Sequence, residues 1–192
     1  SVFALLFNMI PGLLQTAHAA YNYTLQGLQF DDDPSVNGSW TTGNVCGGPG
    51  GCYSEGDNVP VRLAITDLTS GDPYSLGIQH DYKNTSGVIG YENFNRTNPL
   101  QPDYNASGVG IVLDPIQNDD AVRNYTLSFT ALGDTAVIYW NALLGVDASD
   151  FGNGASLHFR LIRGVGGETI GNKEVPISPD KLLSLPSLTL TK

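Results

Sequence analysis

Short stretches in which apolar and polar residues alternate are the feature that most constrains this fold. Residues 59–65, 74–82, 124–131 and 157–161 each place an apolar side chain at almost every second position. A strand with one buried face has this period of two, whereas an amphipathic helix repeats every 3.6 residues. The same reasoning predicts further strands at these ranges: 21–30, with a bulge at Gly27, and 88–91, 109–113, 137–140, 175–177 and 181–185.

These strands are separated by turns rich in Gly, Pro and Asp. Eight to ten short strands of this kind predict an all-β fold, a single antiparallel β-sandwich or jelly roll. A chain of 192 residues is long enough for one sizeable core. We divide it into an N-terminal arm, residues 1–20, and a sandwich domain, residues 21–192. Gly133 and Asp134 predict a hairpin between the strands at 124–131 and 137–140.

The N-terminal arm is apolar from residue 2 to residue 14, apart from Asn8, Pro11 and Gly12, and it carries no charge. This run is shorter than the ~20 apolar residues that a membrane-spanning helix needs. The sequence Ala-His-Ala at residues 17–19 resembles the cleavage site of a secretory signal, which is one interpretation of the segment. The chain opens on Ser1 without a basic region, which favours the other interpretation, a retained arm buried against its own domain or a neighbour.

We predict that the arm enters a neighbouring copy as a donor strand. Residues 15–20 contain no Gly, Pro, Asn or Asp, the residues that make tight turns, so a reversal onto the arm's own domain is disfavoured. An extended arm would present apolar side chains on both faces, and it predicts these subunit-interface residues: Val2, Phe3, Leu5, Leu6, Phe7, Met9, Ile10 and Leu13.

Charge and glycosylation motifs indicate a secreted protein. The formal net charge is −10, and only 9 Lys and Arg residues are available to meet phosphates, which excludes nucleic-acid binding as a main role. Charged residues make up 15% of the chain, against roughly 25% in ordinary soluble domains. N-linked glycans would supply the missing polar surface. The Asn-X-Ser/Thr triplets predict glycosylation at Asn22, Asn37, Asn84, Asn95, Asn105 and Asn124.

Two further motifs suit an extracellular chain. Cys46 and Cys52 flank Gly-Gly-Pro-Gly-Gly and are predicted to form a disulfide that stiffens this loop. Asp31, Asp32 and Asp33 form either a solvated acidic turn or part of a calcium site, because hard cations take clustered oxygen ligands. Calcium is the only cofactor that the sequence suggests.

No residue pattern indicates an enzyme. His80 falls on the apolar side of its strand and is predicted to lie in the core. His158 falls on the polar side, with no nucleophilic Cys and no Gly-X-Ser-X-Gly motif to serve. Asp and Glu lie almost wholly in turns, so no pair can be assigned to glycoside hydrolysis.

Two blocks of the sequence resemble a loose family of secreted, uncharacterised β-sandwich glycoproteins. The first runs from Trp40 through Gly43, Asn44 and residues 53–63, and the second joins Tyr139 and Trp140 to residues 154–161. This resemblance implies a fold and a secreted context. The layout, an apolar arm before a glycosylated sandwich, also resembles subunits of extracellular filaments built by donor-strand complementation, such as bacterial pilins and archaeal threads. It implies that the partners are other copies of the chain in a helical homopolymer.

The alternative function is a secreted carbohydrate- or calcium-binding β-sandwich module. A sugar-binding surface of this kind needs an exposed aromatic cluster. Trp40, Tyr53 and Tyr91 are the candidates for it in this sequence.

Overall fold

A computed structural model describes residues 20–29, 38–47, 52–117, 119–152 and 155–184 of the chain. Within these residues the regular structure is ten strands and three short 3-10 helices, η1, η2 and η3. The strands are β1 (Asn22–Gln29), β2 (Ser39–Thr41), β3 (Asn58–Thr66), β4 (Pro73–Asp81), β5 (Tyr91–Asn95), β6 (Ala106–Leu113), β7 (Val122–Ala131), β8 (Thr135–Leu144), β9 (Leu157–Arg163) and β10 (Lys173–Ile177). The 3-10 helices are η1 (Ala148–Asp150), η2 (Val165–Gly167) and η3 (Pro179–Lys181).

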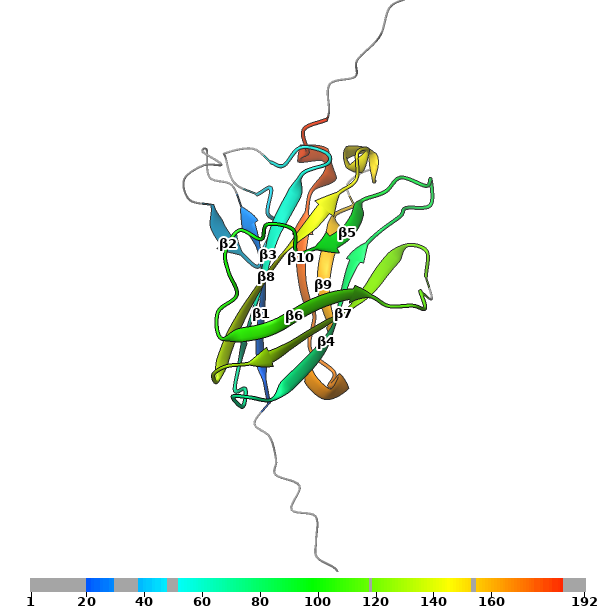
Figure 1. The fold of residues 1–192 in the computed structure, drawn as a ribbon. Coiled ribbons are helices and arrows are strands. Elements are labelled where there is room, and N and C mark those ends of the chain that lie inside the picture. Colours follow the sequence, from blue (N-terminus) through cyan, green and yellow to red (C-terminus); the bar gives the residue numbers. More distant parts are fainter. Residues whose placement is uncertain (1–19, 30–37, 48–51, 118, 153–154, 185–192) are drawn as a thin grey trace, which may run out of the picture.

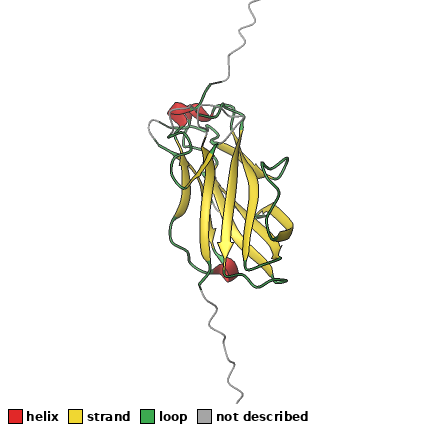
Figure 2. Ribbon diagram, turned by 90° about the vertical axis from the view of Figure 1, so that its left-hand side faces the viewer, coloured by secondary structure: helices red, strands yellow, loops and turns green. Residues whose placement is uncertain are grey.

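The strands form two five-stranded antiparallel sheets packed face to face (Figure 1). The order is β2-β1-β3-β8-β5 in the first sheet and β10-β9-β4-β7-β6 in the second. The 3-10 helices lie at the two ends of the sandwich (Figure 2). This architecture confirms the predicted all-β sandwich. The predicted arm lies outside the described residues except for Ala20.

The core lies between the two sheets and is built from the alternating positions that the sequence marks. In β3, Val59, Val61, Leu63 and Ile65 are fully buried, while the residues between them are partly exposed. β4, β7 and β9 contribute side chains in the same way, so the described residues form one continuous apolar cluster. Burial of alternate side chains from both sheets is the main stabilising term of such a fold.

The predicted hairpin at Gly133–Asp134 is wrong. β7 pairs with β4 and β6 in the second sheet, whereas β8 pairs with β3 and β5 in the first. The turn between them therefore crosses from one sheet to the other, and its backbone bonds to other turns: Leu68 N–H donates to Asp134 and Leu132 N–H donates to Asn105. Both strands bury one face, and these faces pack against each other across the core instead of lying side by side in one sheet.

The predicted bulge at Gly27 is also wrong, because the register between β1 and β3 runs without a shift from Asn22 to Gly27. The glycine serves close packing. A Cβ atom at this position would lie 2.4 Å from Cγ1 of Val45 and 2.9 Å from Cζ of Phe159. A side chain at Gly27 would therefore push against the segment that packs beside β1.

Two other boundaries differ from the sequence prediction. The short strand expected at 88–91 is β5, which begins at Tyr91. Of the strand expected at 181–185, the described residues, 181–184, contribute to η3 and an isolated bridge instead. Pro60 lies near the start of β3, which is a central strand. The pairing of β3 with β1 ends at Val61. The absence of an N–H group at Pro60 therefore removes no hydrogen bond between these two strands.

The packing at Gly27 generates a stability prediction. Gly27→Ala should destabilise the protein by about 1–3 kcal/mol, because the added methyl group overpacks a filled site. Gly171→Ala is the matched control, since a Cβ there meets nothing within 4 Å. Chemical denaturation of both variants checks this, and equal stabilities would contradict the packing role of Gly27.

Candidate functional site

The edges of the two sheets are the candidate functional surface of this fold. Each sheet ends in strands whose outer backbone N–H and C=O groups can pair with another chain. The first sheet ends at β2 and β5, and the second at β10 and β6. Proteins that must stay monomeric block such edges with short strands, prolines, charges or covering loops.

Two of these edges are blocked by short strands, proline or charge. β2 has three residues. β10 carries Pro176, whose carbonyl accepts the N–H of Val45 at 3.1 Å, and Glu174, which pairs with Arg160 at 3.2 Å. Neither edge offers a long, uncharged row of backbone groups.

Where the pairing of β5 with β8 ends, an ion pair caps the backbone of Tyr139 on β8. Asp103 accepts the backbone N–H of Tyr139 on β8 at 3.0 Å, and Arg96 donates to the carbonyl of the same residue at 3.0 Å. Arg96 and Asp103 also pair with each other, at 2.5 Å. Two side chains thus satisfy the groups that an added strand would use. The sequence analysis missed this pair, because it depends on a loop returning to a strand more than thirty residues later in the chain.

β6 is the open edge. It contains eight residues and neither a charged residue nor a proline, and its register with β7 shifts between Ser107 and Gly110, where Gly108 has a positive φ of 62°. One side pairs with β7, and no described residue pairs with the other side. Val112 and Leu113 are 64% and 48% exposed, and Ile116, just beyond the strand, is 71% exposed. The geometry therefore offers an apolar edge with free backbone groups.

The outer side of β1 is a second place where a strand could add. β2 pairs only with its last three residues, and two adjoining grooves of about 380 and 260 Å³, which share Tyr23 and Lys173, run along the remainder. Their linings include Glu168 and Glu174, and the side chains of Tyr23 and Leu25 are already buried. These grooves suit a polar segment better than an apolar one.

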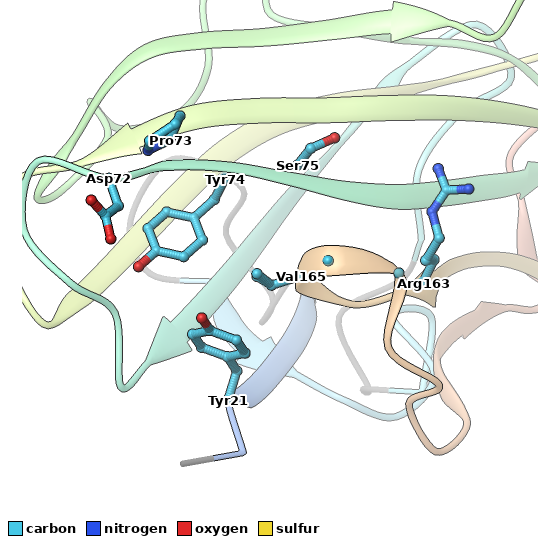
Figure 3. Close-up of a pocket in the computed structure, with 9 residues that line it drawn as sticks. Tyr21, Asp72, Pro73, Tyr74, Ser75, Arg163 and Val165 are labelled. Carbon is cyan, nitrogen blue, oxygen red and sulfur yellow. The ribbon is translucent and has the colours of Figure 1, made fainter. Parts of the chain in front are cut away.

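A third cavity, of about 570 Å³, lies where the described chain enters the sandwich (Figure 3). The rings of Tyr21 and Tyr74 meet edge to face, 6.0 Å apart, with Asp72 beside them and Arg163 on the far side of Val165. Tyr74 is buried and its hydroxyl accepts the N–H of Thr69 at 2.7 Å. Its ring is therefore part of the turn and offers no free stacking face.

The histidines lie as the sequence predicts. His80 is fully buried, which confirms its place in the core, and its Nε2 lies 3.1 Å from the hydroxyl of Tyr125. Burial lowers the pKa of His80 to about 4. His158 lies on the polar side of β9 and contacts Asp81, which also receives two bonds from Arg160.

The cluster around Asp81 joins β4 to β9. The backbone N–H of His158 donates to the Asp81 carboxylate at 2.8 Å. Burial raises the pKa of Asp81, but the hydrogen bonds from His158 and Arg160 outweigh it, so the pKa lies below its ordinary value. With its oxygens bound in this way, Asp81 acts as a structural link between two strands.

The predicted glycosylation sites lie on different elements. Asn22 and Asn124 occupy the outward positions of β1 and β7, next to buried tyrosines, as the alternation predicts. Asn95 ends β5, Asn105 precedes β6, and Asn37 lies outside the described residues. Asn84 differs, because its amide donates to the carbonyl of Phe151 and accepts two backbone N–H groups at 2.9 Å. Its side chain stabilises a loop.

The structure contains the predicted disulfide between Cys46 and Cys52, with Cα atoms 4.9 Å apart. The acidic triplet Asp31, Asp32 and Asp33 lies outside the described residues, so the calcium hypothesis stays a prediction. Among the residues that are described, no group of three or more His, Cys, Asp or Glu side chains is placed to hold a metal.

The aromatic surface required by the carbohydrate-binding alternative does not form from the expected residues. Tyr53 and Tyr91 are buried in the core, where Tyr53 donates its hydroxyl proton to the carbonyl of Leu28 at 2.6 Å. Trp40 is only partly exposed and packs against Arg62 and Tyr139. These three candidates therefore do not form the exposed aromatic cluster that a sugar-binding module of this kind would need.

Comparisons with known proteins add little to what the structure shows about the fold. No protein-family model matches the chain, and no curated protein matches its sequence. The seventh ScaB type I cohesin from Pseudobacteroides cellulosolvens superposes with a TM-score of 0.39 and 8% identity, covering 73% of this chain and 92% of the cohesin. A chain in a complex of a CaDoc0917 variant with CaCohA2 superposes with a TM-score of 0.32 and 12% identity, covering 65% of this chain and 92% of that one. With TM-scores this low, neither structure bears on function.

The buried histidine generates a pH prediction. The pKa of His80 is about 4 in the folded protein and about 6.5 in the unfolded chain, so below pH 6.5 the unfolded state binds a proton that the folded state does not. Stability should therefore fall by up to about 3 kcal/mol between pH 6.5 and pH 4. The lowered pKa of Asp81 also stabilises the folded state, but this contribution is lost only when the carboxylate is protonated, at a pH below the range in which His80 acts.

Unfolding free energies measured across this range check the prediction. His80→Gln should remove most of the decline, whereas His158→Gln, which leaves the buried ring in place, should retain it. An unchanged slope in His80→Gln would show that another group controls the acid sensitivity.

Proposed function

We propose that this chain is a structural subunit of an extracellular, glycosylated filament that assembles head to tail through its N-terminal arm. The observation that carries the proposal is the open, uncharged edge at β6, in a chain that also carries an uncharged apolar run before Tyr21. Such an edge and such a segment each need a partner, and strand addition satisfies both.

The path of the chain supports a head-to-tail arrangement. β1 begins at one end of the sandwich, and the described chain leaves beyond η3 at the opposite end (Figure 1). A segment projecting from one end of a subunit can reach a surface of the next. Contacts between two different surfaces of identical subunits do not close into a dimer, and they generate fibres when the rotation does not close a ring.

The energetics permit a permanent filament. Full burial of an apolar side chain contributes roughly 1.5–3 kcal/mol, and a strand laid along a sheet edge gains only part of this for the eight side chains predicted at the interface. Association and ordering of the arm cost on the order of 4–15 kcal/mol, and the hydrogen bonds of the added strand contribute to the remainder. The strength of association therefore depends on how much of these side chains the acceptor edge covers.

The extracellular setting rests on the sequence motifs and the disulfide. Structural disulfides persist in oxidising compartments, and the Asn-X-Ser/Thr triplets are acceptors only in secreted chains. Glycans would serve as covalent partners that keep a weakly charged surface soluble. Within the described ranges no helix is long and apolar enough to cross a membrane. Calcium at Asp31, Asp32 and Asp33 remains a secondary proposal.

Removing the arm tests the proposal directly. A variant lacking residues 1–14 should stay folded but fail to elongate, because the donor strand is gone. Leu5→Asp with Phe7→Asp should have the same effect at full length, while Asn8→Ala, which keeps the arm apolar, should elongate normally. Negative-stain microscopy and sedimentation measure this, and filaments of unchanged width without residues 1–14 would refute the donor role.

Glycan occupancy forms a separate prediction. Asn22 should carry sugar, because it is exposed on an outward strand position and its amide donates to the exposed side chains of Thr66 and Asp67. Asn84 should be occupied less, because a sugar on its amide would disturb the part-buried bond to the backbone carbonyl of Phe151. Intact-glycopeptide mass spectrometry of the native protein measures each site. If most of the six sites prove empty, sugar is not the solubilising coat.

A further inference from the structure

We propose that β6 is the acceptor strand and that the N-terminal arm of a second copy adds to its open edge, extending the second sheet. This inference rests on the proposed function and names the surface through which that function operates. It commits to one occupant, residues 2–10 of a neighbouring chain.

The side chains of β6 are apolar on both faces, which is unusual at an edge. Ile111 and Leu113 share the core side with Leu127 and Tyr125 of β7, whereas Val112 lies on the outer face opposite Thr126. Strands with continuous apolar runs are typically covered on both faces and lie inside a sheet. Here Val112 and Leu113 are exposed instead. An apolar run of this kind is expected in an interior strand, so we infer that the missing neighbour of β6 comes from another copy of the chain.

The arm matches this edge because both lack charge and both present apolar side chains on two faces. Neither β6 nor residues 2–14 carry a charge. An extended arm places Val2, Ala4, Leu6 and Ile10 on one face and Phe3, Leu5, Phe7 and Met9 on the other. Laid beside β6, one row would cover Leu113 and the other Val112. A segment with one polar face would cover only one of these two exposed apolar side chains.

The lengths also agree. Nine residues, 2–10, precede Pro11, which cannot donate to a ladder, and they would span about 30 Å at roughly 3.3 Å per residue. By the same measure the eight residues of β6 span at most about 26 Å, and the register shift between Ser107 and Gly110 shortens the regular part of this edge, so the arm is long enough to cover it. Pro11, which cannot donate a hydrogen bond, would therefore lie beyond the end of β6, where the added strand no longer has a partner.

The predicted sugar at Asn105 does not obstruct this edge. Asn105 lies one residue before β6 and has a positive φ of 49°. Its amide points toward the turn after β7, since a Cβ at Gly133 would lie 2.8 Å from its Nδ2. A glycan there would leave on the β7 side.

Charged edge variants test the acceptor. Val112→Lys with Leu113→Lys changes two exposed side chains, so the folded monomer and its melting temperature should persist while elongation falls at least tenfold. Val146→Lys is the matched control, because Val146 is also exposed, at 54%, but lies in the turn that follows β8 and not in a strand. Filaments formed normally by the double variant would overturn the inference about β6. The proposed function would survive this result if arm deletion still abolished elongation.

A cross-linking experiment identifies the occupant. One protein carrying Leu5→Cys and another carrying Val112→Cys should form a mixed disulfide dimer under mild oxidation. Leu5→Cys mixed with Val146→Cys should not. A chain carrying both Leu5→Cys and Val112→Cys that cross-links only within itself would show that the arm folds back. Leu6→Cys, which lies on the opposite face of the arm, is tested with Val112→Cys in the same way, and absence of a cross-link from both Leu5→Cys and Leu6→Cys in filaments would exclude β6 as the acceptor.

Discussion

The pairing of backbone groups at the sheet edges is the constraint on which the whole structure depends. A sandwich of two five-stranded sheets has four edges, and every N–H and C=O group along them must meet water, a side chain or another strand. At the edge beside β5, Arg96 and Asp103 fill the place of a strand by bonding both backbone groups of Tyr139. β6 has no equivalent cover within the described residues. The proposed assembly rests on this contrast between a capped and an uncapped stretch of edge.

Much of the fold could be predicted from alternation, because burial of one face imposes a period of two on the sequence. β3, β4, β7 and β9 follow this pattern closely. β5 does not, since Glu92, Asn93 and Asn95 interrupt it, and the strand was expected a few residues too early. Strand partners were harder to predict, because a short turn can either form a hairpin or cross between sheets. The turn at Gly133 crosses, since the buried faces of β7 and β8 oppose each other.

The candidate site could be predicted only in part. The arm and the glycosylation motifs are local features of the sequence, but an edge exists only once the order of strands is known. One signal was available: Ile111, Val112 and Leu113 form an apolar run within a strand that has no charge. Such a run predicts a strand covered on both faces, and the structure shows one side without a neighbour among the described residues. The ion pair of Arg96 and Asp103 had no comparable signal, because its role depends on where the loop returns.

The closed core of the described sandwich changes how strand donation would work in this protein. Tyr23, Leu25, Val59 and Leu161 are already buried, and Gly27 is required because the space beside it is filled by Val45 and Phe159. The donated strand therefore would not complete a missing core, as the sequence-based mechanism assumed. It would extend a finished sheet, and its contribution would come from ladder bonds and from covering Leu113 and Val112. Because the free subunit is then stable by itself, the interface can be weakened at β6 without unfolding the sandwich. Assembly and folding are separable in such a design.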